Sequence, residues 1–141
     1  MIHQLSIFLE NTSGTLITVL QELKQARIQL ISMTIADTAE YGILRIICAE
    51  PLRACEVLKE AGVAVALSDV FALELDNQPG AGADVVAAFS KAGISLSYIY
   101  TFHMRGKGIM IFRTDNAERA KEVIILNKLD FVADKNLAEM K

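Results

Sequence analysis

The sequence lacks several features that define large classes of protein. It has only two cysteines, Cys48 and Cys55, and no cluster of lysine and arginine, with a net charge of −3 at pH 7. So few cysteines argue against a disulfide-stapled domain, and the charge provides no positive field for a phosphate backbone. Every apolar run is broken by charge or glycine well before the ~18–20 residues that span a bilayer. We therefore expect core thiols and no nucleic-acid or membrane partner.

Signals for targeting and for metal binding are also missing. Residues 1–4 have neither a basic start nor a long apolar core, so the cytoplasm is the default location. His3 and His103 have no HxxH, HExxH or cysteine-pair context, and the spacing Cys48-x6-Cys55 is not that of a zinc site. We expect no metal and no cofactor, and surface or packing roles for both histidines.

One stretch of the sequence occurs twice. Residues 75–82 (LDNQPGAG) repeat the pattern of residues 9–16 (LENTSGTL), and in this alignment Asn11 matches Asn77. The same shift aligns further pairs without a gap: Val19 with Val85, Ala26 with Ala92, Ile28 with Ile94, Gly42 with Gly108, and Arg53 with Arg119. A chance match would not keep one register this far, so we interpret the chain as two copies of one supersecondary unit, over residues 1–68 and 69–141.

In the first copy the spacing of apolar residues switches between period 2 and period 3.6. Period 2 and β-branched runs predict strands over residues 3–10, 28–36, 43–48 and 63–67, with a turn over residues 37–42. Helical stripes predict helices over residues 16–26 and 51–61, the second with Leu52, Cys55, Leu58 and Ala61 on its apolar face. The order is therefore strand, helix, strand, strand, helix, strand.

The second copy repeats this order directly after Ser68 and Asp69, without a flexible linker. Strands are predicted over residues 70–75, 94–102, 108–113 and 129–133. One helix is expected between the turn at residues 77–82 and Gly93, and another begins at a capping box of Asp115 and Glu118. The tail up to Lys141 has no clear pattern. The order predicts an α+β fold of two ferredoxin-like βαββαβ units, with antiparallel sheets and helices on one face.

Apolar residues make up 52% of the chain, which is high for a soluble protein. Each copy has about 70 residues, a size at which one core contributes only roughly 3–5 kcal/mol of stability. Extra apolar surface then indicates buried interfaces. We expect the copies to pack on each other or on a second chain, as in a homodimer.

The repeated turn also suggests a binding function. A glycine loop at a helix N-terminus offers unpaired N–H groups and a partial positive charge to an anion, and an α-carboxylate fits such a site. The helix dipole alone contributes about 0.3–2 kcal/mol, whereas micromolar to millimolar recognition needs roughly −8 to −4 kcal/mol. Other groups must therefore contribute.

The whole chain resembles a tandem pair of ACT domains, small-molecule-sensing regulatory modules of amino-acid metabolism. The family pattern is a strand, then Asp/Asn-x-Pro-Gly-x-Leu, a helix, and Ala-Gly-Ile-Asn-Ile. The second copy has Asn77-Gln78-Pro79-Gly80 and Ala92-Gly93-Ile94-Ser95-Leu96, and the first copy has the looser matches of residues 11–16 and 26–30. Two departures stand out, since Ser13 replaces the usual proline and Gly82 replaces the usual leucine.

The resemblance implies a stand-alone, non-catalytic regulator that binds a free amino acid. In such pairs the sheets join side by side, and the ligand lies between the first strand–helix loop of one copy and the start of the second strand of the other. Carried over, the two loops are Asn11, Thr12, Ser13, Gly14, Thr15 and Leu16, and Asn77, Gln78, Pro79, Gly80, Ala81 and Gly82. The opposing walls are Ile31, Ser32 and Met33, and Ser97, Tyr98 and Ile99. Asn11 and Asn77 would meet the ligand's amine or carboxylate, unless they only cap their turns.

Two other functions remain open. One is a regulatory partner subunit of an amino-acid biosynthetic enzyme that acts without a ligand of its own. The other is a small acylphosphatase-like enzyme, which shares the order of elements, although no loop of its type is evident. The aromatic run of residues 98–102 divides between two faces of a strand, so packing against another domain or chain is favoured over base stacking.

Overall fold

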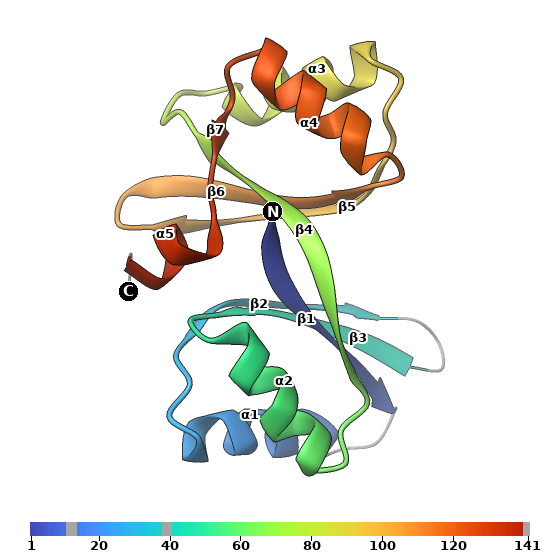
Figure 1. Ribbon diagram of the computed structural model, residues 1–141, viewed down its shortest axis with the longest axis vertical. Helices are drawn as coiled ribbons and strands as arrows, with labels where there is room; N and C mark the ends of the chain where they lie inside the picture. Colours follow the sequence, from blue (N-terminus) through green and yellow to red (C-terminus); the bar gives the residue numbers. More distant parts are fainter. Residues whose placement is uncertain (11–13, 38–40, 140–141) are drawn as a thin grey trace. The chain divides into compact units, whose positions relative to one another are not determined.

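The chain repeats one order of elements, which is strand, helix, strand, strand, helix, strand (Figure 1). The structure is a computed structural model, and it describes residues 1–10, 14–37 and 41–139. It divides into two compact units. The N-terminal unit comprises His3–Asp69 and Leu137–Glu139, and the C-terminal unit comprises Met1–Ile2 and Val70–Asn136.

The N-terminal unit has a sheet with the strand order β2-β3-β1-β4. Its elements are β1 (Ile2–Glu10), α1 (Thr15–Gln25), β2 (Leu30–Asp37), β3 (Tyr41–Cys48), α2 (Pro51–Glu60) and the first part of β4 (Val65–Leu75). Strand β3 pairs antiparallel with β1 and β2, so that Leu44 lies between Ile7 and Ile35. Both helices cover the same face of this sheet (Figure 1). The turn expected between β2 and β3 lies partly outside the described residues.

The C-terminal unit has the order β5-β6-β4, with β7 on the other side of β4. Its further elements are α3 (Ala81–Lys91), β5 (Leu96–Met104), β6 (Lys107–Thr114), α4 (Ala117–Leu126), β7 (Asp130–Phe131) and α5 (Asp134–Glu139). Again both α3 and α4 cover one face of the sheet (Figure 1). Each unit thus has the predicted ferredoxin-like order. No helix among the described residues is both long and apolar enough to cross a membrane.

The bounds of the elements reproduce the repeat seen in the sequence. Helix α3 has the bounds of α1 shifted by the repeat length, and the same shift converts β3 into β6 and α2 into α4 at both ends. The helices α1 and α3 also start alike, at Gly14 (φ +102°) and Gly80 (φ +87°), both in the left-handed region. A glycine is needed there because a Cβ atom makes this conformation costly. The predicted α+β class is confirmed.

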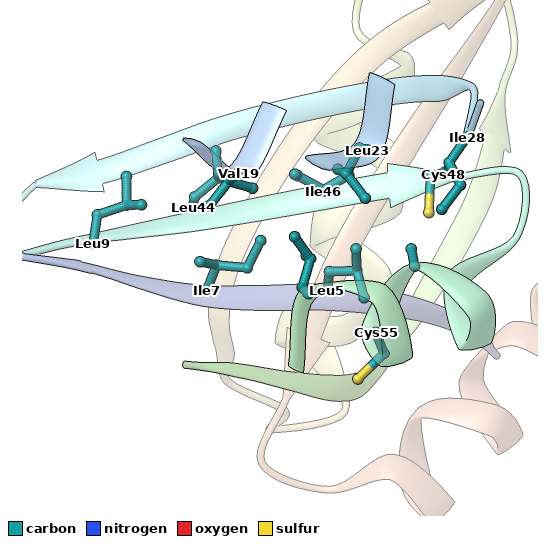
Figure 2. Packing of buried hydrophobic residues seen from close by; sticks show 12 residues of the cluster. Leu5, Ile7, Leu9, Val19, Leu23, Ile28, Leu44, Ile46, Cys48 and Cys55 are labelled. Atoms are coloured by element: carbon teal, nitrogen blue, oxygen red, sulfur yellow. The ribbon is translucent and has the colours of Figure 1, made fainter. Parts of the chain in front are cut away.

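Each unit has its own apolar core. In the N-terminal unit Leu5 and Ile7 of β1 face Val19 and Leu23 of α1 (Figure 2). The two cysteines, Cys48 and Cys55, are buried in this core as free thiols, as predicted. In the C-terminal unit three aromatic rings form the centre. The Phe112 ring lies 5.3 Å from that of Phe71 and 4.9 Å from that of Phe89, measured between centroids.

The prediction of separate strands over residues 63–67 and 70–75 is wrong. The structure has one strand, β4, that continues through Ser68 and Asp69. Both polar side chains find partners on β1: the Ser68 hydroxyl lies 3.1 Å from that of Ser6, and the Asp69 carboxylate lies 3.7 Å from Nε2 of His3. Because strand pairing satisfies them, these residues need no turn. The last strand is also shorter than predicted, at Asp130–Phe131.

Details at the two helices α2 and α4 differ as well. The buried face of α2 consists of Ala54, Cys55 and Leu58, whereas Leu52 is 60% exposed and Ala61 lies beyond the last turn. Of the four residues predicted for this face, Cys55 and Leu58 are therefore buried, and Ala54 is buried in place of Leu52.

The cap of α4 is one residue later than the predicted capping box. Asn116 is the N-cap residue, and its side-chain oxygen accepts a hydrogen bond from the backbone N–H of Arg119 at 3.1 Å. The Asp115 carboxylate instead accepts a hydrogen bond from the hydroxyl of Thr114 at 3.2 Å. Asn and Asp cap helices about equally well, so the position of the chain turn decides which of them is used.

Candidate ligand-binding loops

A cavity of about 370 Å³ lies beside the β4–α3 loop of the C-terminal unit. The loop contributes all six residues that the sequence predicted for it, Asn77 to Gly82. The other lining residues are Leu75 and Asp76 at the end of β4, Thr101 and His103 of β5, and Gly108 of β6. The cavity therefore lies where the ends of neighbouring strands meet the first turn of a helix.

The first turn of α3 brings backbone N–H groups and their partial positive charge to this cavity, and Asp84 places a carboxylate in the same turn. Gly80 is the N-cap residue and provides no side-chain hydrogen bond, and the N–H of Ala81 donates to the carbonyl of Gln78 at 3.2 Å. The N–H groups of the next residues have no acceptor within the helix. Gly82 lies among them, and a Cβ added to it would lie 3.6 Å from Cε of Met110, an ordinary van der Waals contact. This helix start can receive an anion.

Sequence reasoning missed two residues of the cavity, Thr101 and His103. They lie two positions apart on β5, so they share one face of the strand. His103 pairs with Gly108 in the register of β5 and β6, and Gly108 pairs with Leu75 at the end of β4. This register carries the imidazole toward the β4–α3 loop. The alternation of β5 was visible in the sequence, but its register against β4 was not.

The N-terminal unit has a corresponding loop before α1. Gly14 opens the helix, and its carbonyl accepts hydrogen bonds from the N–H and the hydroxyl of Thr18 at 3.0 and 2.9 Å. Thr15 and Gly14 line a cavity of about 560 Å³, whereas Leu16 packs against the core. The predicted residues Asn11, Thr12 and Ser13 lie outside the described residues.

The two copies differ in charge around this loop. The cavity beside Gly14 is lined by Phe8, Glu10, Thr15, Thr18 and residues 61–64. The equivalent cavity of the C-terminal unit has about 440 Å³, and carboxylates occupy four of the matching positions: Glu74, Asp76, Asp84 and Asp130. Asp76 also lines the cavity beside the β4–α3 loop. The C-terminal loop thus combines a positive helix start with a neighbouring carboxylate.

The predicted opposing walls lie on the edge strands β2 and β5. In both strands the pairing register shifts at the matching residue, Ile31 in β2 and Ser97 in β5. Such bulges often redirect side chains next to functional sites. Met33 is 49% and Ile99 42% exposed. None of the residues 31–33 and 97–99 lines the cavity beside the β4–α3 loop, and their role as walls stays a prediction.

Comparisons with known proteins give a consistent family. Residues 1–141 match the family model of the ACT domain pair. A protein from Bacteroides thetaiotaomicron, known from a crystal structure, is 36% identical, with 98% of this chain and 96% of that chain covered and a TM-score of 0.91. The comparison with curated proteins gives no match.

Two more distant structures show the same fold. The regulatory subunit of aspartate kinase from Thermus thermophilus, in its ligand-free form, is 18% identical, with 88% of this chain and 91% of that chain covered and a TM-score of 0.60. The corresponding subunit from Thermus flavus is 18% identical, with coverages of 88% and 90% and a TM-score of 0.57. At these identities the likeness concerns the fold alone.

Proposed function

The chain belongs to the ACT domain pair family, and from this premise we propose that it is a non-catalytic regulatory protein that binds a free amino acid at its glycine loops. The observation that supports this most is the cavity beside the β4–α3 loop. Its volume of about 370 Å³ is in the range of small-molecule sites, and it brings the start of α3 together with polar side chains of β5.

The charges around this cavity suit a zwitterion. The ligand's α-carboxylate would lie at the first turn of α3, where N–H groups and the helix dipole favour an anion. Asp76 lines the same cavity and provides a carboxylate for the α-ammonium group. Asn77 lies next to it and offers both a donor and an acceptor. Thr101 and His103 would then contact the ligand's side chain.

Hydrogen bonds supply only part of the expected affinity. A hydrogen bond to a charged group stabilises a complex by about 1.5–3 kcal/mol, and the dipole adds about 0.3–2 kcal/mol. Two or three such bonds with the dipole give about 3–11 kcal/mol before the cost of association, whereas micromolar to millimolar dissociation constants require a net binding free energy of about −8 to −4 kcal/mol, so contacts with the ligand's side chain must contribute as well. This range suits the sensing of a free metabolite.

We further propose that the regulated target is a separate enzyme. The fold neighbours from Thermus are regulatory subunits of aspartate kinase, and this chain covers about the same length as they do. By analogy with these subunits, this ACT pair would act on an amino-acid biosynthetic enzyme by association, as a homodimer. The ligand would change the affinity for that enzyme.

A thermal-shift panel of the proteinogenic amino acids tests the ligand proposal. A ligand that binds only the folded state at a hundred times its dissociation constant stabilises it by about 2.7 kcal/mol. We expect at least one amino acid to raise the melting temperature, and Asn77→Ala to reduce the rise. Ser90→Ala, at the exposed far end of α3, is the matched control and should leave it unchanged.

Two outcomes would contradict the proposal. If no amino acid shifts the melting temperature, a partner subunit that works without its own ligand becomes the better explanation. If the purified chain hydrolyses acyl phosphates, the protein is an enzyme.

A further inference from the structure

A second cavity lies at the other end of α1, away from the glycine loops. It has a volume of about 450 Å³ and is lined by Leu20, Leu23, Lys24, Arg27, Ile28, Gln29 and Leu30. We call it the α1–β2 groove. It shares no residue with the cavities beside either glycine loop. Its size is that of a small-molecule site.

The floor of the groove is apolar. Leu23 and Ile28 are 1% and 5% exposed and belong to the core of the N-terminal unit (Figure 2). Leu20 and Leu30 are partly exposed at its sides. An apolar group placed here would lose contact with water, which is the main source of affinity for small apolar ligands.

The rim of the groove carries two cations. Lys24 and Arg27 are three positions apart and exposed. In the part of the chain that the structure describes, no carboxylate pairs with Lys24 or Arg27, whereas Arg53 pairs with Glu50 at 2.8 Å. The two charges remain available to an anion that enters the groove.

Arg27 adopts a conformation that is unfavourable for its residue type. Its φ is +58°, and the turn is closed by hydrogen bonds from Arg27 N to Lys24 O and from Ile28 N to Leu23 O, both 3.0 Å. The second copy makes the same turn with Gly93 at φ +74°, which a glycine adopts without strain. The exchange runs the other way at the end of the second helix of each copy, where Lys128 (φ +52°) takes the place of Gly62 (φ +81°). What distinguishes Arg27 is therefore the charge that it places at the rim of the groove.

The end of a helix normally repels anions, because its last carbonyls carry partial negative charge. Here Nη1 of Arg53 on α2 donates to the carbonyl of Ala26 at 2.8 Å, so this carbonyl has a partner, while Glu50 balances the charge of Arg53. The hydrogen bonds that Arg53 donates to the Glu50 carboxylate raise the pKa of Arg53 above its ordinary value, so this cation stays charged. In the second copy the matching Arg119 pairs with Glu122 at 2.8 Å.

The repeat supplies an internal comparison for the groove. At the matching positions the second copy keeps apolar residues, Phe89, Ile94 and Leu96, but has Ser90 for Lys24 and Gly93 for Arg27. The cationic rim is thus specific to the first copy. A packing role for the turn would be served by either set of residues.

We propose that the α1–β2 groove binds a small organic carboxylate with an apolar chain, its carboxylate between Lys24 and Arg27 and its chain against Leu23 and Ile28. This site is separate from the proposed amino-acid site, and its ligand needs no ammonium group. The two cations form charge-assisted hydrogen bonds to the carboxylate, and the floor selects for the chain.

Titration of the isotope-labelled 141-residue chain with hexanoate, followed by amide NMR shifts, tests the proposal. We expect saturable shifts over residues 20–30 and weaker binding of butyrate, by about fourfold per methylene removed. Hexylammonium, with the same chain and the opposite charge, should not bind. Equal binding of hexylammonium would overturn the proposal, and so would hexanoate shifts that grow linearly or lie elsewhere.

The double variant Lys24→Ser/Arg27→Gly installs the residues of the second copy. We expect it to fold, because glycine suits the conformation at position 27. Its affinity for hexanoate should be at least about tenfold lower than that of the unmodified chain. Lys59→Ser, which removes an exposed cation from α2, is the matched control. Asn77→Ala should leave hexanoate binding intact, so a failure here is distinguishable from failure of the amino-acid site. Unchanged affinity for hexanoate in the double variant would refute carboxylate binding by Lys24 and Arg27 in the groove.

Discussion

Two glycines of the candidate site, Gly80 and Gly82, should respond to the same substitution with opposite signs. Gly80 has φ +87°, and an added Cβ would have no neighbour within 4 Å. The cost of Gly80→Ala is therefore purely conformational, and a left-handed conformation costs an L-residue about 1–2 kcal/mol. We expect Gly80→Ala to lower the free energy of unfolding by that amount.

Gly82 lies two residues further on, inside the first turn of α3. Its added Cβ would lie 3.6 Å from Met110 Cε, an ordinary van der Waals contact. Alanine is favoured over glycine within helices by about 0.8–1.0 kcal/mol. We therefore expect Gly82→Ala to raise the free energy of unfolding by about 0.5–1 kcal/mol, since first-turn positions gain somewhat less than the middle of a helix.

The two variants should then differ by about 1.5–3 kcal/mol, or roughly 5–12 °C in melting temperature for a chain of this size. Urea unfolding followed by circular dichroism measures the difference directly, with an unchanged slope as the sign that only stability has moved. Each variant serves as the control of the other because both add one methyl group to the same loop. If Gly80→Ala is as stable as the unmodified chain, or Gly82→Ala is the less stable variant, the assignment of the helix start at Gly80 is refuted.

Two further predictions concern the C-terminal unit. Phe89→Ala removes a fully buried ring that lies 4.9 Å from that of Phe112, and should lower the free energy of unfolding by about 3–5 kcal/mol in urea titrations; a loss under 1 kcal/mol would contradict the packing. Asn116→Ala should cost about 0.5–2 kcal/mol in the same assay because it removes the cap of α4, whereas Asp115→Ala should stay within about 0.5 kcal/mol. If Asp115→Ala were the more destabilising of the two, Asp115 rather than Asn116 would be the N-cap residue of α4.

Much of the fold could be predicted from the sequence because the signals occur in duplicate. The shift that aligns Asn11 with Asn77 also relates the bounds of α1 to α3 and of α2 to α4. A weak pattern in one copy was therefore supported by a stronger one in the other. This agreement between local pattern and repeat made the order of elements predictable.

The errors arose where tertiary contacts outweigh local propensity. Ser68 and Asp69 have the composition of a turn, but Ser6 and His3 on β1 give both side chains partners within a strand. In each case the deciding partner lies far away in the sequence or depends on the register of the sheet.

The candidate site was only partly visible in advance. The glycine loop of residues 77–82 follows from a local motif, and the structure places all of it around one cavity. Thr101 and His103 line the same cavity because the pairing register of β5 with β6, and of β6 with β4, places them beside the loop. A motif cannot reveal residues that a sheet brings to it. In the proposed amino-acid site, the ligand's side chain would then contact residues that the motif does not contain.

Strand β4 also restricts how the chain can change during evolution. Val65 and Leu67 pack on one core, and Phe71 and Leu73 belong to the other, all at odd-numbered positions of one uninterrupted strand. Insertion of a single residue after Asp69 would reverse the alternation for everything that follows and turn the second set of apolar side chains to the opposite side of the strand. Gains and losses of residues at this junction should therefore occur in even numbers, or through an extruded loop that keeps the parity.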